Sequence, residues 1–160
     1  MNRTILGAAA LCALAALGSA WAETPMTPAT LTPEQIIAAR QAAYDNSAVT
    51  FSMLRAAVKD GTDVKRAAYP ADALAKWAKV LPSLFPRGTS ATEFPALTHA
   101  KPEIWSDRAG FDKAAADYLT AATKAAEYAH AGDTENFKAQ VDGIKKACDS
   151  CHQNYKMKAD

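Results

Sequence analysis

The chain has 160 residues, enough for one domain, and its 18 Lys and Arg nearly balance its 17 Asp and Glu. A net charge of +1 argues against binding to nucleic acid and against a polybasic contact with a membrane surface. The sequence is rich in alanine and poor in glycine and in runs of β-branched residues, so it favours helices.

Residues 1–22 have the pattern of a secretory signal peptide, with a short basic start, an apolar run and a small-residue cleavage site at Ala20-x-Ala22. The run is shorter than the ~20 apolar residues that span a membrane, so we expect no membrane anchor. Cleavage leaves residues 23–160 as a single exported domain. It also removes Cys12, so the mature chain has no disulfide framework.

The first predicted helix follows a loose lead-in over 23–31. Thr32 is expected as its N-cap, with Pro33 in the first turn and Gln35 closing a capping box. An inward seam then runs to the helix end at 60–61. Its apolar positions are Ile37, Tyr44, Phe51 and Val58, with Arg40, Ser47 and Leu54 between them. The two polar positions either mark the end of the core or suit a helix that faces a cofactor with acidic edges.

The second predicted helix is shorter and follows Pro70. Apolar residues recur there at helical spacing up to Pro82, at Leu74, Trp77, Ala78 and Leu81. The stretch 82–102 contains several prolines and Gly88, and we expect it to cross one end of the domain as a long loop.

Two further helices complete the pattern. The third is predicted from 103–106 to Ala131, with Gly132 as a left-handed cap and Asp133 as the next N-cap. Its inward residues are Phe111, Ala115, Tyr118, Ala122, Ala125 and Ala129, and those of the fourth are Phe137, Val141, Ile144, Cys148, Cys151 and Tyr155. Four amphipathic segments predict an all-α antiparallel four-helix bundle.

The last helix carries the pattern C-x-x-C-H at Cys148, Cys151 and His152, which is typical of c-type haem attachment. Two thiols three positions apart lie on one helical face, so both can bond to one porphyrin edge while His152 reaches the iron. A thioredoxin-like motif would follow a strand, and a structural zinc site would need two further ligands. The sequence meets neither condition, and it therefore predicts one haem c held covalently near the C-terminus.

A residue bound to the other side of the iron would make a six-coordinate haem. The candidates are Met26, Met53, Met157, His99 and His130. Met157 lies on the same helix as His152, and the others fall in loops, at a helix end or off an inward seam. An open iron face is the direct inference.

Four stretches together resemble the cytochrome c′ family, in colinear order over essentially the whole mature chain. They are residues 32–44, 84–89, 101–107 and 148–155. The resemblance implies a four-helix bundle whose C-terminal haem is high-spin and five-coordinate. It also implies binding of nitric oxide and carbon monoxide, discrimination against dioxygen, a periplasmic location and a homodimer.

The resemblance assigns roles to individual residues. Tyr44 stands at the position that caps the distal iron face, and Arg40 and Gln41 stand at positions that contact a haem propionate. Phe85 resembles a distal-pocket aromatic residue. Lys156 occupies a proximal position usually held by arginine, so a role that needs a planar, bidentate guanidinium is not expected to carry over.

These observations predict a gas-binding haem protein that can also exchange electrons with an unidentified periplasmic partner. The alternative is a low-spin, six-coordinate electron-transfer cytochrome of the same fold, which absorption spectra would distinguish. An enzyme such as a nitric oxide reductase or a peroxidase is less favoured, because no added acid–base group is evident for N–O or O–O chemistry.

Overall fold

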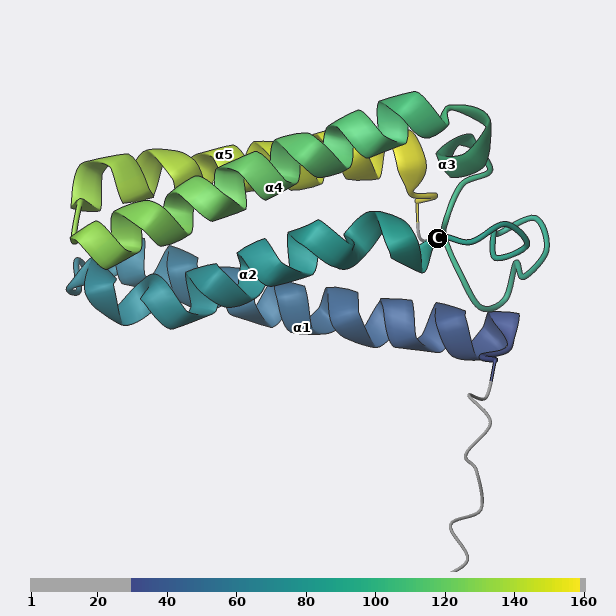
Figure 1. Cartoon of the computed structure of the whole chain (residues 1–160), viewed down its shortest axis with the longest axis horizontal. Coiled ribbons are helices and arrows are strands. Elements are labelled where there is room, and N and C mark those ends of the chain that lie inside the picture. The colour runs from purple at the N-terminus through teal and green to yellow at the C-terminus, as the bar shows by residue number, and fades with distance from the viewer. Residues whose placement is uncertain (1–29, 159–160) are drawn as a thin grey trace, which may run out of the picture. The chain divides into compact units, whose positions relative to one another are not determined.

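Four long helices form an antiparallel bundle in the computed structural model, which describes residues 30–158 (Figure 1). They are α1 (Pro33–Lys59), α2 (Ala68–Val80), α4 (Arg108–Ala131) and α5 (Thr134–Tyr155). Helices α1 and α2 lie side by side, as do α4 and α5, and α2 packs against α4. The predicted four-helix bundle is confirmed, whereas the predicted signal peptide and its cleavage site lie outside the described residues.

The boundaries of α1 and α5 follow local rules that the sequence makes visible. Thr32 Oγ1 accepts a hydrogen bond from the Gln35 N–H at 3.3 Å, and Gln35 Oε1 accepts one from the Thr32 N–H at 2.9 Å, which is the predicted capping box. At the turn between α4 and α5, Gly132 has a φ of 76°, the left-handed conformation that glycine adopts without strain. Asp133 then caps α5 by accepting a hydrogen bond from the Asn136 N–H at 3.1 Å.

The second helix starts earlier than its prediction. A 3₁₀ turn (Val64–Ala67) leads directly into α2 at Ala68, so Pro70 lies in the first helical turn, where its missing N–H costs no hydrogen bond. A second 3₁₀ turn (Leu81–Leu84) follows α2. Residues 85–102 then form the expected long loop at the end of the bundle where α5 finishes (Figure 1).

The third predicted helix is in fact two helices, so the prediction of one continuous segment is wrong. Helix α3 (Glu103–Ser106) ends at Asp107, whose φ of −115° and ψ of 56° lie outside the helical region. The Asp107 carboxylate accepts a hydrogen bond from the Gly110 N–H at 3.1 Å and one from the Tyr155 hydroxyl at 2.9 Å. The break is therefore stabilised partly by a residue 48 positions away, which local periodicity does not reveal.

Buried apolar side chains form the core of the described bundle, and Leu54, Phe137 and Ile144 are completely buried. Three alanines of α4 are also fully buried, which lets the neighbouring helices approach closely: Ala122, Ala125 and Ala129. None of the helices described between residues 30 and 158 is long and apolar enough to cross a membrane.

Candidate haem site

A cavity of about 560 Å³ lies inside the bundle, a volume within the ~300–1,000 Å³ that is usual for sites of small ligands and cofactors. All four long helices and the loop contribute to its walls. The lining includes Arg40, Tyr44, Phe51, Trp77, Phe85, Thr98, Phe111, Tyr118, Cys148, Cys151, His152 and Tyr155. The wall surface is thus mainly apolar, although polar and charged side chains such as Asp45, Lys145 and Asp149 also belong to the lining.

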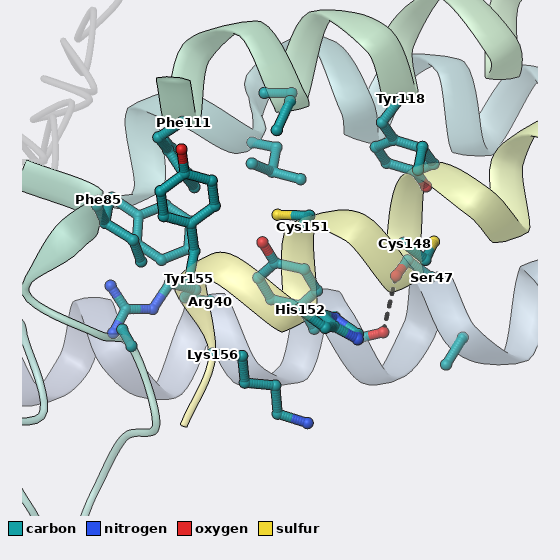
Figure 2. A pocket seen from close by; sticks show the side chains of 18 of the residues that line it. Arg40, Ser47, Phe85, Phe111, Tyr118, Cys148, Cys151, His152, Tyr155 and Lys156 are labelled. Carbon is teal, nitrogen blue, oxygen red and sulfur yellow. Dashed lines mark hydrogen bonds between the residues drawn. The ribbon is translucent and has the colours of Figure 1, made fainter. Parts of the chain in front are cut away.

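The two cysteines of the C-x-x-C-H motif lie on α5, with His152 next to them, and all three line the cavity (Figure 2). Burial raises the pKa of the Cys148 thiol, and burial together with Cys148 raises that of Cys151 to about 11. Both thiols are therefore protonated at neutral pH. Forming each thioether consumes one S–H group by addition across a vinyl group, and a protonated thiol is a poor ligand for a competing metal ion because the thiolate is the form that binds metals.

His152 lines the cavity and is partly exposed to solvent. Partial desolvation and the neighbouring Lys156 both lower the pKa of its imidazole. A lowered pKa favours the neutral ring, which is the form that binds a metal through nitrogen.

Tyr44 and Phe85 also line the cavity, within a cluster of aromatic rings. The Tyr44 ring lies 5.2 Å from the Trp77 ring and 6.4 Å from the Phe85 ring, measured between centroids. Phe85 is 5% exposed and lies 4.9 Å from the Phe111 ring. Burial, reinforced by Cys151, raises the pKa of Tyr44 far above its usual value of 10, so its hydroxyl stays protonated.

Arg40 is the most deeply buried charged side chain among the described residues, at 2% exposure. Its guanidinium lies 4.4 Å from the Phe85 ring centroid. Its terminal nitrogens donate hydrogen bonds to Leu84 O, Thr89 Oγ1, Thr89 O and Thr98 Oγ1 at 2.9–3.3 Å. Arg40 therefore fixes the loop that forms one cavity wall. Gln41 also holds this loop, from the exposed side of α1, because its side-chain amide donates a hydrogen bond to Leu97 O at 2.6 Å.

The far end of the loop is attached to the last turn of α5. The Lys101 N–H donates to Tyr155 O at 3.0 Å, and the Met157 N–H donates to His99 O at 2.8 Å. Lys156 forms an isolated bridge with Ala100 between these bonds, and its side chain is exposed at the cavity edge (Figure 2).

Two features of the site were not predicted. Periodicity placed Trp77 on an inward seam, but it did not show that the buried indole Nε1–H has no hydrogen-bond acceptor among the described residues. Periodicity also placed Tyr155 on the α5 seam, but not the bond from its hydroxyl to Asp107. Burial, the Asp107 hydrogen bond and the Asp107 charge raise the pKa of Tyr155 to about 12. Neither feature can be predicted from local sequence, because hydrogen-bond partners of a buried side chain can come from any part of the fold.

The residues present fit a haem. Two thiols on one helical face, an adjacent imidazole and a largely aromatic and aliphatic cavity in a helical bundle define a c-type cytochrome of the four-helix-bundle class. When bound, the haem supplies the iron that binds ligands and changes redox state.

Comparisons with known proteins identify the family. A cytochrome c′ family model matches residues 35–156. Cytochrome c′ of Allochromatium vinosum is 30% identical over 152 residues, covering 94% of this chain and 95% of that protein. The crystal structure of cytochrome c′ from Thermochromatium tepidum has a TM-score of 0.74 at 29% identity, covering 81% of this chain and all of that one.

A second similar structure, a nitric oxide complex of a cytochrome c′ variant from Alcaligenes xylosoxidans, has a TM-score of 0.73 at 26% identity, covering 82% of this chain and all of that one. The chain belongs to the cytochrome c′ family. Its cofactor is haem c, attached covalently through Cys148 and Cys151.

Proposed function

We propose that the chain is an exported gas-binding haem protein in which His152 is the single axial protein ligand of a five-coordinate, high-spin iron. The opposite iron face is open to nitric oxide and carbon monoxide. The same haem exchanges electrons with a periplasmic redox partner. We propose a role in gas binding and electron transfer rather than catalysis, since no residue of the described part of the chain is assigned as an acid or base for N–O or O–O chemistry.

The observation that carries the proposal is the composition of the cavity walls. No methionine lines the cavity among the described residues, and His99 is the one imidazole there besides His152. The backbone of His99 is bonded to Met157, directly after α5, which puts it beside the helix end that carries His152. Met53 is exposed on α1, and His130 bonds to Asp72 at 3.0 Å outside the cavity lining. A sixth protein ligand is therefore not supported.

Tyr44, with Trp77 and Phe85 around it, is proposed as the cap over the open iron face. Arg40 and Gln41 are proposed to lie at the haem propionates, with Lys156 on the proximal side. Aromatic and aliphatic walls accept a small diatomic gas, and no donor dedicated to bound dioxygen is assigned among the described residues, provided that the Tyr44 hydroxyl and the Trp77 Nε1–H are not directed at it. A similar solved structure, from Alcaligenes xylosoxidans, is itself a nitric oxide complex, which supports the same ligand here.

Absorption and resonance Raman spectra of the purified holoprotein test this function. We expect high-spin, five-coordinate haem in the ferric and ferrous states, nitric oxide and carbon monoxide adducts of the ferrous protein, and oxidation in air without a stable oxy spectrum. A low-spin spectrum without added ligand would favour the electron-carrier alternative. A long-lived oxy complex would contradict the gas selectivity and would direct attention to the unpartnered Trp77 Nε1–H.

We also propose a periplasmic location and a homodimer. The pattern of residues 1–22 supports export, and a mature N-terminus at Glu23, measured by mass spectrometry, would test it.

The proposed homodimer is supported by the exposed apolar side chains of α1. Val49 and Met53 are 65% and 54% exposed there, which supports association through that helix. A similar solved structure is described as a cytochrome c′ with ligand-controlled dimer dissociation. Sedimentation of the holoprotein with and without carbon monoxide would establish both its assembly and any response to ligand.

A further inference from the structure

The buried charge of Arg40 has no counter-ion within the described part of the chain. Its hydrogen bonds all go to neutral carbonyl and hydroxyl oxygens, and no carboxylate between residues 30 and 158 lies within ion-pair distance. Buried charges in proteins are normally paired, because an isolated ion loses its hydration without compensation. Arg40 lines the haem cavity, so an anion inside the cavity is the natural partner.

Thr98 provides a second, independent indication. Its side chain is 5% exposed and lines the same cavity. Thr98 Oγ1 accepts hydrogen bonds from Arg40 at 2.9 Å and from the Ala100 N–H at 3.2 Å. A hydroxyl that accepts twice still has one hydrogen to donate, and no acceptor for it is found among the described residues. Because Thr98 lines the cavity, a group bound inside the cavity is the remaining candidate acceptor.

Comparison with Thr89 shows that, of the two threonines bound to Arg40, Thr98 alone has a hydroxyl hydrogen without an acceptor among the described residues. Thr89 too is a buried threonine, 1% exposed, whose hydroxyl oxygen accepts a hydrogen bond from Arg40, at 3.1 Å. Its hydroxyl donates to Pro86 O at 2.9 Å, so its donor is used within the loop. Thr89 does not belong to the cavity lining.

We propose that the Thr98 hydroxyl, with the Arg40 guanidinium behind it, is an anion-binding site that donates a hydrogen bond to one carboxylate side chain of the haem. Arg40 supplies the charge and fixes the loop, whereas Thr98 supplies the directional donor that positions the carboxylate. This inference rests on the covalent haem of the family and is independent of whether the iron binds gases.

The assignment gives Thr98 a measurable effect on the haem. A carboxylate that loses a hydrogen-bond donor carries more negative charge close to the iron, which favours the ferric state. The bending vibration of the haem carboxylate in the resonance Raman spectrum should change frequency for the same reason. Loss of the donor should therefore shift this band and lower the midpoint potential of the haem.

The test compares the holoprotein with Thr98→Val, Thr98→Ser and Thr89→Val. We expect Thr98→Val to shift the carboxylate band and lower the midpoint potential, and Thr98→Ser to restore both because it keeps the hydroxyl. Thr89→Val should keep the wild-type band, although it also removes an acceptor of Arg40. If Thr98→Val does not load haem, Thr98→Ala, which introduces no new atom, makes the same comparison.

Two results would overturn the proposal. One is an unchanged carboxylate band in both Thr98→Val and Thr98→Ala. The other is an equal shift in Thr89→Val, which would assign the effect to a loosened loop. Covalent haem and nitric oxide binding should persist in every variant, so a failure of the proposed function would appear separately, in the wild-type protein.

Discussion

Single residues in this site serve both the fold and the chemistry. Arg40 interrupts an apolar helical seam, and that interruption alone left open whether the residue ends the core or faces a cofactor. The structure adds a role that the sequence did not suggest, because the guanidinium binds the loop from 84 to 98 through hydrogen bonds that span more than 40 positions. Periodicity shows which residues face inward, but it does not show which partners they meet.

Tyr44 gives the first residue-scale prediction. If it caps the open iron face, Tyr44→Met places a flexible thioether there, and a thioether is a competent sixth haem ligand. The lost packing against Trp77 and Phe85 should cost about 1–3 kcal/mol of unfolding free energy, partly offset by the iron–sulfur bond. We expect a ferrous spectrum shifted toward low-spin haem and slower nitric oxide binding, measured by absorption and stopped flow.

Met53→Leu is the control for this experiment, because Met53 is 54% exposed on the same helix and outside the cavity lining. Its spectrum and its nitric oxide binding rate should match the wild type. A Tyr44→Met protein that stays fully high-spin and binds gas at the wild-type rate would remove Tyr44 from the distal face.

Gly110 gives a second residue-scale prediction. A Cβ atom at this position would overlap Asp107 Oδ2 and lie 2.5 Å from Tyr155 Oη, so it would disrupt the bond that joins α5 to the α3–α4 break. We expect Gly110→Ala to lower the unfolding free energy by about 1–3 kcal/mol, as overpacking does in other proteins. Urea denaturation of the holoprotein, followed by circular dichroism, would measure it.

Gly143→Ala is the matched control in α5. Its added Cβ would meet Ala121 Cβ at 3.7 Å, an ordinary contact. Because alanine is favoured over glycine inside a helix by about 0.5–1 kcal/mol, this variant should be neutral or slightly more stable. Equal losses in the two variants would argue against the steric explanation for Gly110.

At the scale of elements, the sequence predicts what local chemistry determines. The capping box at Thr32, the left-handed Gly132 and the N-cap Asp133 each act within a few residues, and all three are where the sequence places them. The helix break at Asp107 was missed because Tyr155, which accounts for part of its stability, is distant in sequence. The motif likewise predicted the thiols and His152 on α5, whereas the Thr98 hydroxyl and the lack of an acceptor for Trp77 Nε1–H within residues 30–158 required the structure.

The turn between α4 and α5 gives an element-scale prediction. Side-chain and backbone hydrogen bonds from Asn136 lower the pKa of Asp133 below its usual value of 3.8. A lowered folded-state pKa means that ionised Asp133 stabilises the fold above that usual value, and that this stability is lost as the pH falls toward the folded-state pKa. Asp133→Asn keeps a capping oxygen but does not titrate, so its unfolding free energy should fall less on acidification from about pH 6 to about pH 3.

Urea midpoints across this pH range, compared with the wild type, are the measurement. The haem absorption spectrum should be the same in both proteins, because the turn lies at the end of the bundle away from the loop (Figure 1). Parallel pH profiles for the two proteins would contradict the assigned role of the carboxylate.

At the scale of the whole domain, the bundle has two functionally different halves. In one half, Leu54, Phe137 and three alanines of α4 are completely buried and do not line the cavity. In the other half, the helices and the loop surround a cavity of about 560 Å³. The compact half holds the helices in register, and the open half accommodates a flat cofactor.

This division predicts the behaviour of the protein without its cofactor. Cys148→Ala combined with Cys151→Ala removes both thioethers, so the denatured chain should have the mass of the bare polypeptide, whereas the wild type from a maturation-competent host should carry one additional haem.

Without haem, the unfilled cavity of this double variant should admit water or collapse, because so large an apolar space is not stable without contents. We expect a lower unfolding temperature and fast hydrogen exchange in the loop from 85 to 102 and in the first half of α1. The segments around Ala125 and Phe137 should stay protected, since their contacts do not involve the cavity. Uniform loss of protection along the chain would show that haem attachment stabilises the bundle as a single unit.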